Sequence, residues 1–381
     1  MAGRRPNRMR RVAPEAAENA DRSSLPLMAA VATEAGLEGA LRLPEELAAG
    51  GYFEAGLVDQ WQRISEHFWG LIRHHSDPAG RIAFLATHPE PRVRFFAASL
   101  WARWGMDRPQ DALPEIQALA DDEDFRVLES TQAFGLRPFA VHWGPAIREY
   151  LQDWVVHPSP KVRRAVITAL RPRGFWVSHL EWAQTEPALL VPMLEAMREE
   201  SDRFPANAVA NCFNDLSVKH PMLVLSILER WSKLDGPMVE HMTRKGLRTL
   251  LKKGDLRALR LLGMGEVELE VEVSLRQGQV VAPNTNLCFD LNIYAPGEGG
   301  EVELVYEIET TGRKEGRPRR KRYQGGRYLV PDGGTLELPI RERIFDRKAA
   351  PLINGPAAAT FFLNGEQEAR VEFEIQREAE A

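Results

Sequence analysis

The sequence contains no long hydrophobic run, because Arg, Glu or Pro interrupts its apolar stretches every few residues. A helix that spans a bilayer needs about 20 consecutive, mostly apolar residues, which excludes a membrane-spanning segment. The basic first residues, Met1–Arg11, are not followed by the apolar stretch of a signal peptide. We therefore expect a cytoplasmic protein without a membrane partner.

Cysteine is scarce as well, since the 381 residues include only Cys212 and Cys288. Two distant thiols provide neither a disulfide framework nor the closely spaced ligands of a metal site. We interpret both as small buried apolar residues in a reducing compartment.

A net positive charge is also lacking, because the formal charge is −5. The sum argues against a nucleic-acid partner, but the distribution along the chain is more informative. Acidic residues gather at Asp121–Asp124 and again between Glu195 and Asp202. Basic residues gather in three clusters: Lys161, Arg163, Arg164, Arg171 and Arg173; Arg244, Lys245, Arg248, Lys252 and Lys253; and Arg313, Lys314, Arg317, Arg319, Arg320, Lys321 and Arg322. This pattern permits DNA binding without proving it.

Composition divides the chain into three parts. Residues 1–24 have almost no large apolar side chains, which predicts a disordered basic arm. From 25 to 264, apolar residues recur at three- and four-residue spacing, which indicates helices. Residues 265–377 begin with the strict alternation of Glu266–Val273 that is typical of a half-buried strand.

The helical part contains a repeated motif. His-Pro-Glu-Pro-Arg-Val-Arg at 88–94 returns as His-Pro-Ser-Pro-Lys-Val-Arg at 157–163, and Asp-Asp-Glu-Asp-Phe-Arg-Val at 121–127 lies about midway. The repeat of roughly 35 residues has the size of a two-helix solenoid unit. Each copy predicts a turn before a helix whose early Val faces the core and whose neighbouring Arg faces outward. This pattern is typical of HEAT-like repeats.

The C-terminal part reads as a series of short strands separated by Pro-Gly, Gly-Gly and Asn-Gly turns. The further candidates are 287–294, 301–309, 327–330, 335–340, 358–363 and 370–375. Such a series in about 110 residues favours an immunoglobulin-like sandwich. We predict a multidomain fold, an all-α HEAT-like repeat solenoid followed by an all-β immunoglobulin-like sandwich.

Several strings go beyond a generic repeat. They are 131–139 (TQAFGLRPF), 162–164 with 171–176 (RPRGFW), 209–217 (VANCFNDLS) with 219–221, and 247–255 (LRTLLKKGD); in the sandwich they are 305–308, 316–319 and 363–365. In this order, the sequence resembles the AlkC branch of the HEAT-like DNA alkylation-repair glycosylases over about 120–375. The C-terminal sandwich resembles the domain that AlkC proteins append.

The resemblance implies a monomeric protein that acts on duplex DNA containing alkylated bases, nucleoid-associated when bound, and that needs no metal or organic cofactor. Its reaction would be hydrolysis of the N-glycosidic bond of a cationic alkylated purine of the 3-methyladenine type. Cleavage passes through an oxocarbenium-like sugar, which a nearby carboxylate stabilises. The family is understood to kink DNA and leave the base stacked.

The resemblance also carries residue roles. The family has a Glu at the positions of Ala133 and Thr168, so two of its three carboxylates are missing. Asp215 matches the third and is the catalytic candidate. Arg164 and Trp176 match DNA-contacting and lesion-packing positions. Further DNA-binding candidates are Arg171, Arg173, Arg248, Lys252, Arg319, Arg320 and Arg322. If these roles are right, Arg164, Trp176 and Asp215 should converge on one concave surface.

Other interpretations remain open. Asp215 could be a helix cap or an ion-pair partner, and Arg163 could bind a carboxylate of the neighbouring repeat. The basic segment 313–327 could be a solvated hairpin, although its charge density favours a loop that contacts phosphate. Glu129, one helical turn before Ala133, could replace the missing Glu. The whole protein could be a non-catalytic DNA-binding paralogue, or a HEAT scaffold for protein partners.

Overall fold

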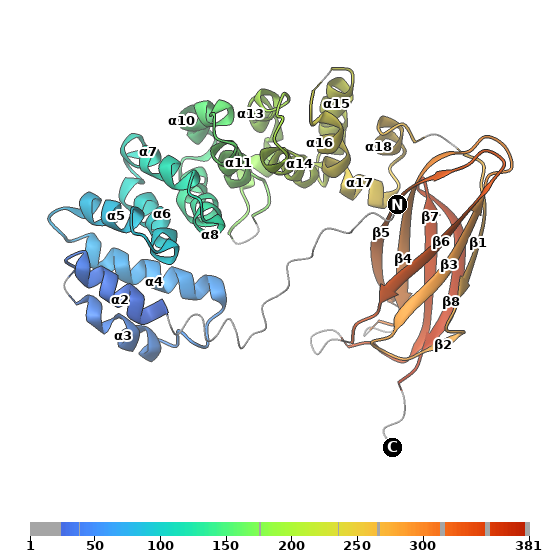
Figure 1. Ribbon diagram of the computed structural model, residues 1–381, viewed down its shortest axis with the longest axis horizontal. Coiled ribbons are helices and arrows are strands. Elements are labelled where there is room, and N and C mark those ends of the chain that lie inside the picture. The colour runs from blue at the N-terminus through green and yellow to red at the C-terminus, as the bar shows by residue number, and fades with distance from the viewer. Residues whose placement is uncertain are drawn as a thin grey trace. The chain divides into compact units, whose positions relative to one another are not determined.

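The computed structural model describes residues 24–37, 39–174, 177–234, 236–264, 267–312, 317–346 and 351–377. The arm predicted over residues 1–24 lies outside these ranges up to residue 23. The chain forms two compact units, Met1–Asp215 and Leu216–Ala381. Helices are followed by strands (Figure 1), which confirms the predicted fold class. Because the last helices belong to the same unit as the strands, the domain boundary near 264 stays a prediction.

The helices have the following bounds. They are α2 (Ser24–Glu34), α3 (Leu43–Ala49), α4 (Leu57–Ile72), α5 (Pro78–Ala86), α6 (Pro91–Gly105), α7 (Pro109–Ala120), α8 (Phe125–Ser130), α9 (Arg137–His142), α10 (Arg148–Leu151), α11 (Pro160–Ala169), α12 (Glu181–Thr185), α13 (Val191–Ala196), α14 (Arg203–Ser217), α15 (Pro221–Ser232), α16 (Val239–Gly246), α17 (Arg248–Lys253) and α18 (Leu256–Leu261). Short turns η1 (Ala40–Arg42), η2 (Thr131–Leu136), η3 (Gly144–Ile147), η4 (Gln152–Val156) and η5 (Pro187–Leu190) connect some of them, and η2 is π-helical.

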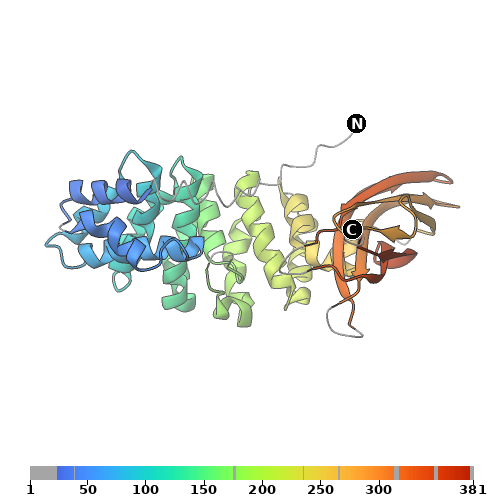
Figure 2. The same cartoon turned by 90° about the horizontal axis from the view of Figure 1, so that it is seen from below.

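The repeated motif marks helix starts in the first unit, whose helices stack in succession (Figures 1 and 2). Helices α6, α8 and α11 begin directly after the N-cap residues Glu90, Asp124 and Ser159. Each cap side chain accepts a hydrogen bond from the backbone N–H two residues later, which satisfies one donor that the first turn leaves open. The early valine of each copy is buried, as predicted.

The repeat also positions an arginine by the same contacts in two copies. Arg163 donates to both carboxylate oxygens of Glu200, at 2.6 and 2.9 Å, and to the carbonyl of His157 at 2.7 Å. Arg94 makes the equivalent bonds to Asp122, at 2.6 and 2.9 Å, and to the carbonyl of His88. The interpretation of Arg163 as an arginine that binds a carboxylate of another part of the solenoid is therefore confirmed.

Arg163→Met is expected to lower the free energy of unfolding by about 2 kcal/mol, because the buried Glu200 carboxylate loses its charged donor. Burial alone would raise the pKa of Glu200, but hydrogen bonds from Arg163 and backbone amides hold that pKa below its usual value. The stabilisation is therefore present above the ordinary glutamate pKa and is lost as the pH falls through the lowered one. Urea unfolding followed by circular dichroism measures the change, and exposed Arg126→Met is the control. Equal losses of unfolding free energy in both variants would contradict the stabilising role of the Arg163–Glu200 ion pair.

Two sheets form the sandwich. One has the order β1 (Glu270–Leu275), β3 (Asn286–Tyr294), β6 (Thr335–Arg343); the other has the order β2 (Val280–Val281), β8 (Glu366–Ile375), β7 (Gly355–Leu363), β4 (Gly300–Thr310), β5 (Arg319–Val330). Their inward side chains form one core, in which the rings of Phe289 and Phe361 meet edge to face at 5.3 Å. The sequence predicted every strand except β2, whose two residues are too few to show alternation.

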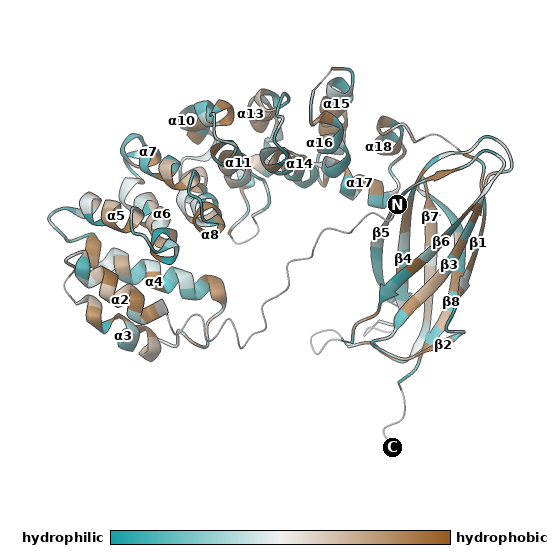
Figure 3. Cartoon of the chain, in the orientation of Figure 1, coloured by the Kyte–Doolittle hydropathy of each residue, from teal (hydrophilic) through white to brown (hydrophobic). Residues whose placement is uncertain are grey.

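The loop predicted over 313–327 is wrong from Arg319 onward, because β5 begins there. Arg320 and Arg322 lie directly opposite Glu309 and Glu307 of β4 and form ion pairs with them. Opposite charges at facing positions stabilise an antiparallel ladder, so a hydrophilic run can still be a strand. Figure 3 accordingly shows β5, the edge strand next to β4, as largely hydrophilic. Residues 313–316 lie outside the described ranges.

Helices α17 and α18 rest on the sandwich within the second unit. Gly254 ends α17 with φ +72°, and a Cβ there would lie 2.6 Å from the Cα of Gly365 in the β7–β8 turn. No side chain fits at either glycine. Arg322 and Arg327 of β5 donate to the carbonyls of Lys252 and Leu262. Two of the strings that carry the family resemblance, 247–255 and 363–365, therefore touch each other.

The two cysteines differ from each other. Cys212 is 1% exposed, and burial raises the pKa of its thiol to about 12, so the interpretation as a buried apolar residue holds for it. Cys288 is only partly buried, because it lies on the outward side of β3, and the same interpretation is wrong there. Within the described ranges, no helix combines the length and apolar character needed to cross a membrane.

Candidate nucleic-acid interface

A cavity of about 190 Å³ opens in the first unit between α8, η2, α11, α14 and the loop that follows α11. We call it the arginine cavity. Its lining residues are Glu129, Gln132, Ala133, Arg137, Arg164, Thr168, Ala169, Arg171, Arg173, Gly174, Val177, Asn207, Ala208 and Asn211. The structure thus brings together three of the predicted DNA-binding residues, Arg164, Arg171 and Arg173. It also places Ala133 and Thr168, the positions of the missing carboxylates, in the same wall.

The charge of this lining is strongly positive. Among its described residues there are four arginines and a single acid, Glu129. Neutral amides and a hydroxyl, from Gln132, Asn207, Asn211 and Thr168, supply the remaining polar groups. Arginine forks in a partly closed cavity bind phosphate oxygens well, because the attraction is screened less there than at an open surface.

Arg164 is fixed on two sides. Its Nη2 donates to Oε1 of Glu129 at 2.8 Å, and its guanidinium lies over the ring of Phe204 at 4.3 Å and that of Phe125 at 5.6 Å. Its Nη1 is buried and has no hydrogen-bond partner in the part of the chain that the structure describes. Contacts with Glu129, Phe204 and Phe125 therefore fix Arg164, and its Nη1 keeps a donor that the described residues do not use.

Asp215 lies behind the wall of the arginine cavity and does not line it. Its side chain is nearly buried, with 8% of the residue exposed, and Oδ2 accepts a hydrogen bond from Nε of Arg171 at 2.9 Å. The ion-pair interpretation of Asp215 is thus confirmed, and Arg171 stands between this carboxylate and the cavity. Trp176, the third residue expected at this surface, lies outside the described residues, as does Phe175.

Arg137 shapes the loop that carries Arg171 and Arg173. It is 2% exposed, and it donates to the carbonyls of Ala169 at 2.8 Å, Arg171 at 2.6 Å and Ser178 at 2.7 Å. Burial, with repulsion from Arg171, lowers its pKa to about 10, so the side chain stays charged at neutral pH. The sequence alone indicated no role for Arg137. The feature that could have indicated a buried arginine is its position inside the otherwise apolar stretch 133–141.

Gly174 lets this loop turn back on itself. A Cβ at Gly174 would lie 2.2 Å from the carbonyl oxygen of Val177, which no side chain could tolerate. The backbone N–H of Gly174 donates to Nδ1 of His179, and the N–H of Leu180 donates to the carbonyl of Pro172. Residues 170–174, which follow α11, are thus tied to residues 177–180, and they present Arg171 and Arg173.

The other predicted DNA-binding residues belong to the second unit. Arg248 donates to the carbonyl of Lys245, and Lys252 accepts from Arg322 through its own carbonyl. Arg320 and Arg322 are engaged by the glutamates of β4, and Arg322 also lies over the ring of Phe362. Arg319 is on the opposite face of β5, where it lines a small pocket with Lys321 and Arg343. Their role in DNA binding stays a prediction.

Glu129→Gln is expected to tighten DNA binding, because the change frees the Arg164 guanidinium from its carboxylate partner. One more cation available to phosphate should steepen the slope of log Kd against log salt concentration by about 1. Fluorescence anisotropy with a labelled duplex over a salt series measures this slope. Exposed Glu115→Gln on α7 removes the same charge elsewhere, and it should leave the slope unchanged. Weaker binding by Glu129→Gln would contradict the expectation.

Comparisons with known proteins agree with this architecture. The chain superposes on the Pseudomonas fluorescens alkylpurine DNA glycosylase AlkC, solved bound to DNA containing an abasic site analog, with a TM-score of 0.82 and 21% identity over 96% of this chain and 100% of that one. It is 24% identical to the uncharacterized protein YhaZ of Bacillus subtilis (strain 168) over 260 residues, 67% of this chain and 72% of YhaZ. No family model matches the sequence. The resemblance seen in the sequence is therefore confirmed at the level of the fold.

Proposed function

We propose that this protein binds duplex DNA and hydrolyses the N-glycosidic bond of cationic alkylated purines. The observation that carries the proposal is the arginine cavity, which Arg164, Arg171 and Arg173 line, and in which Arg164 pairs with Glu129 and Arg171 with Asp215. The AlkC fold of the chain supports it, since the solved protein with that fold is an alkylpurine DNA glycosylase bound to DNA.

The arrangement suits a reaction that needs charge stabilisation but little acid. An alkylated purine leaves as a neutral base, so the protein has only to stabilise the positive sugar and position a water. Phosphates of the bound strand compete with the carboxylates for Arg171 and Arg164. Once Arg171 turns to a phosphate, the Asp215 carboxylate faces the cavity and can act on the oxocarbenium ion. Glu129 can add a second negative charge in the same way.

A second candidate function is recognition of damaged or distorted DNA without catalysis. It is favoured by a specific observation: Glu129 in the cavity wall and Asp215 behind it both form ion pairs with arginines, and Ala133 and Thr168 offer no carboxylate. A cavity of this charge grips backbone phosphates whether or not a glycosidic bond is cleaved.

One experiment separates the two functions. The purified full-length protein is incubated with methylated duplex DNA, and release of free 3-methyladenine and 7-methylguanine is measured by chromatography. Binding to the same duplex is measured in parallel over a salt series. Release above the spontaneous rate supports the glycosylase. Salt-dependent binding without release supports recognition of damaged DNA without catalysis. Absence of both binding and release would contradict both functions.

A further inference from the structure

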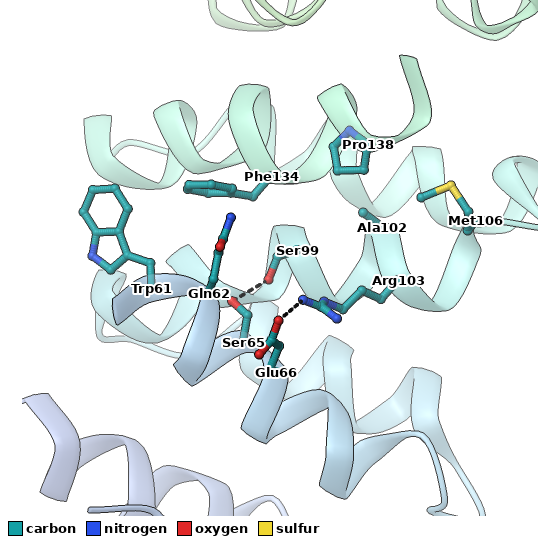
Figure 4. A pocket seen from close by; sticks show the side chains of 10 residues that line it. All are labelled: Trp61, Gln62, Ser65, Glu66, Ser99, Ala102, Arg103, Met106, Phe134 and Pro138. Carbon is teal, nitrogen blue, oxygen red and sulfur yellow. Dashed lines mark hydrogen bonds and ion pairs between the residues drawn. The ribbon is translucent and has the colours of Figure 1, made fainter. Parts of the chain in front are cut away.

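A second and larger cavity, of about 320 Å³, lies in the same unit on the other side of η2. We call it the aromatic pocket. Figure 4 shows its lining: Trp61, Gln62, Ser65 and Glu66 from α4; Ser99, Ala102, Arg103 and Met106, from α6 and the residue after it; Phe134 from η2; and Pro138 from α9. Phe134 directly follows Ala133 of the arginine cavity, so one π-helical turn contributes a wall to both. Its volume is at the lower end of the range for small-molecule sites.

One end of the pocket is an aromatic corner. The rings of Trp61 and Phe134 meet at an angle of 76° with centroids 6.0 Å apart. Phe95 supports both from behind, 5.0 Å from Trp61 and 6.0 Å from Phe134, and its carbonyl accepts a hydrogen bond from Ser130. This corner offers a ring face and a ring edge to a flat ligand, which is how aromatic side chains hold nucleobases.

The lining also contains polar groups that can form hydrogen bonds with a ligand. Gln62 extends from α4 toward Phe134 (Figure 4), and its amide makes no hydrogen bond to the described part of the chain. An amide offers a donor and an acceptor side by side, which matches the hydrogen-bonding edge of a base. The hydroxyls of Ser65 and Ser99 bond to each other at 2.9 Å and keep lone pairs for a further donor.

The charge of the pocket is balanced. Glu66 and Arg103 form its only charged pair among the lining residues, with 3.8 Å between Arg103 Nη2 and Glu66 Oε1. Neither a bare phosphate nor a free cation is favoured by such a lining, in contrast to the arginine cavity. A flat, neutral, heteroaromatic ligand with a hydrogen-bonding edge meets every feature described.

We propose that the aromatic pocket binds a neutral purine base. The base can come from two sources, since a purine freed by glycosidic cleavage is neutral and a base turned out of a bound strand presents the same groups. The assignment of the base to glycosidic cleavage rests on the proposed function. The binding of a free purine in this pocket does not depend on it. The position beside η2 places the pocket next to the arginine cavity for either source.

The test uses the full-length protein with free adenine and 3-methyladenine as probes. Saturation-transfer NMR should show contact between the protein and the purine protons in the wild type and in Phe84→Ala, an exposed phenylalanine on α5 outside the pocket. Phe134→Ala should weaken binding about 10- to 100-fold, because stacking is lost. Gln62→Ala should weaken it about tenfold. Since Gln62 is exposed on α4, this second variant cannot owe its effect to misfolding.

The source is identified with a duplex that carries 2-aminopurine at one position. The emission of 2-aminopurine is compared before and after the wild-type protein binds the duplex. If it changes, and Phe134→Ala and Gln62→Ala each abolish this change, the pocket holds a base of the strand. Binding of free purines without that change assigns it to a released base. The proposal is overturned if neither probe responds, or if both variants bind like wild type. Because binding is read without cleavage, failure of the glycosylase proposal in the release assay would remain a separate result.

Discussion

Asp215→Asn is expected to lower the rate of alkylpurine release by about 10²–10³-fold, the loss typical when one charge-stabilising group is removed from a preorganised site. The amide keeps the shape of the side chain and removes its negative charge. Arg171 loses its ion-pair partner at the same time, so binding to undamaged duplex DNA should not weaken. Single-turnover release of free 3-methyladenine gives the rate, and anisotropy gives the binding.

The matched control is Asp153→Asn, an exposed aspartate of η4 in the same unit, which should release base at the wild-type rate. An Asp215→Asn protein as fast as wild type would remove Asp215 from the proposed mechanism. If Glu129→Gln then lost the activity, the role would pass to the carboxylate that already lines the arginine cavity.

Arg137→Met should lower the free energy of unfolding by about 3–4 kcal/mol. Three backbone carbonyls would lose their charged donor, and the bond to Ala169 is buried while those to Arg171 and Ser178 are partly buried. A buried loss of this kind costs about 1–3 kcal/mol before relaxation. The loop that carries Arg171 and Arg173 would lose its anchor, so duplex binding should weaken as well. Urea unfolding and anisotropy together measure both effects.

Two further variants sharpen this expectation. Arg137→Lys retains the charge but has one donor atom for three separated carbonyls, so its stability should fall between those of wild type and Arg137→Met. Arg108→Met removes an exposed arginine of the same unit that lies over the ring of Trp104, and it should change stability by less than about 1 kcal/mol. Unchanged stability of Arg137→Met would show that the loop holds itself together by other contacts.

Local patterns predicted the fold well. The His-Pro-x-Pro motif fixed two helix starts because proline and a capping side chain act within one turn, independently of the rest of the chain. The alternation of apolar and polar residues predicted the strands for the same reason, since it too is a local pattern. The start of β5 could not be predicted, because the charges of Arg320 and Arg322 are compensated by Glu309 and Glu307 on another strand.

The sequence indicated three residues of the arginine cavity, Arg164, Arg171 and Arg173, but not the partners of its arginines. Arg164, Arg171 and Asp215 are near one another, yet their partners come from 35 and 44 positions away in the chain. Sequence spacing cannot indicate that Glu129 faces the cavity while Asp215 is covered. The role of Arg137 was missed because a buried arginine is recognised only from the carbonyls around it, and carbonyls are present at every residue.

The contact between Gly254 and Gly365 bears on how this chain could have been assembled. Any side chain at one glycine would strike the backbone at the other, so the two positions constrain each other. A sandwich exchanged between relatives at the end of α18 would need a partner helix α17 that also ends in glycine. A sandwich cut from the chain at 264 would lose the contacts of Arg322 and Arg327 with the carbonyls of Lys252 and Leu262 as well.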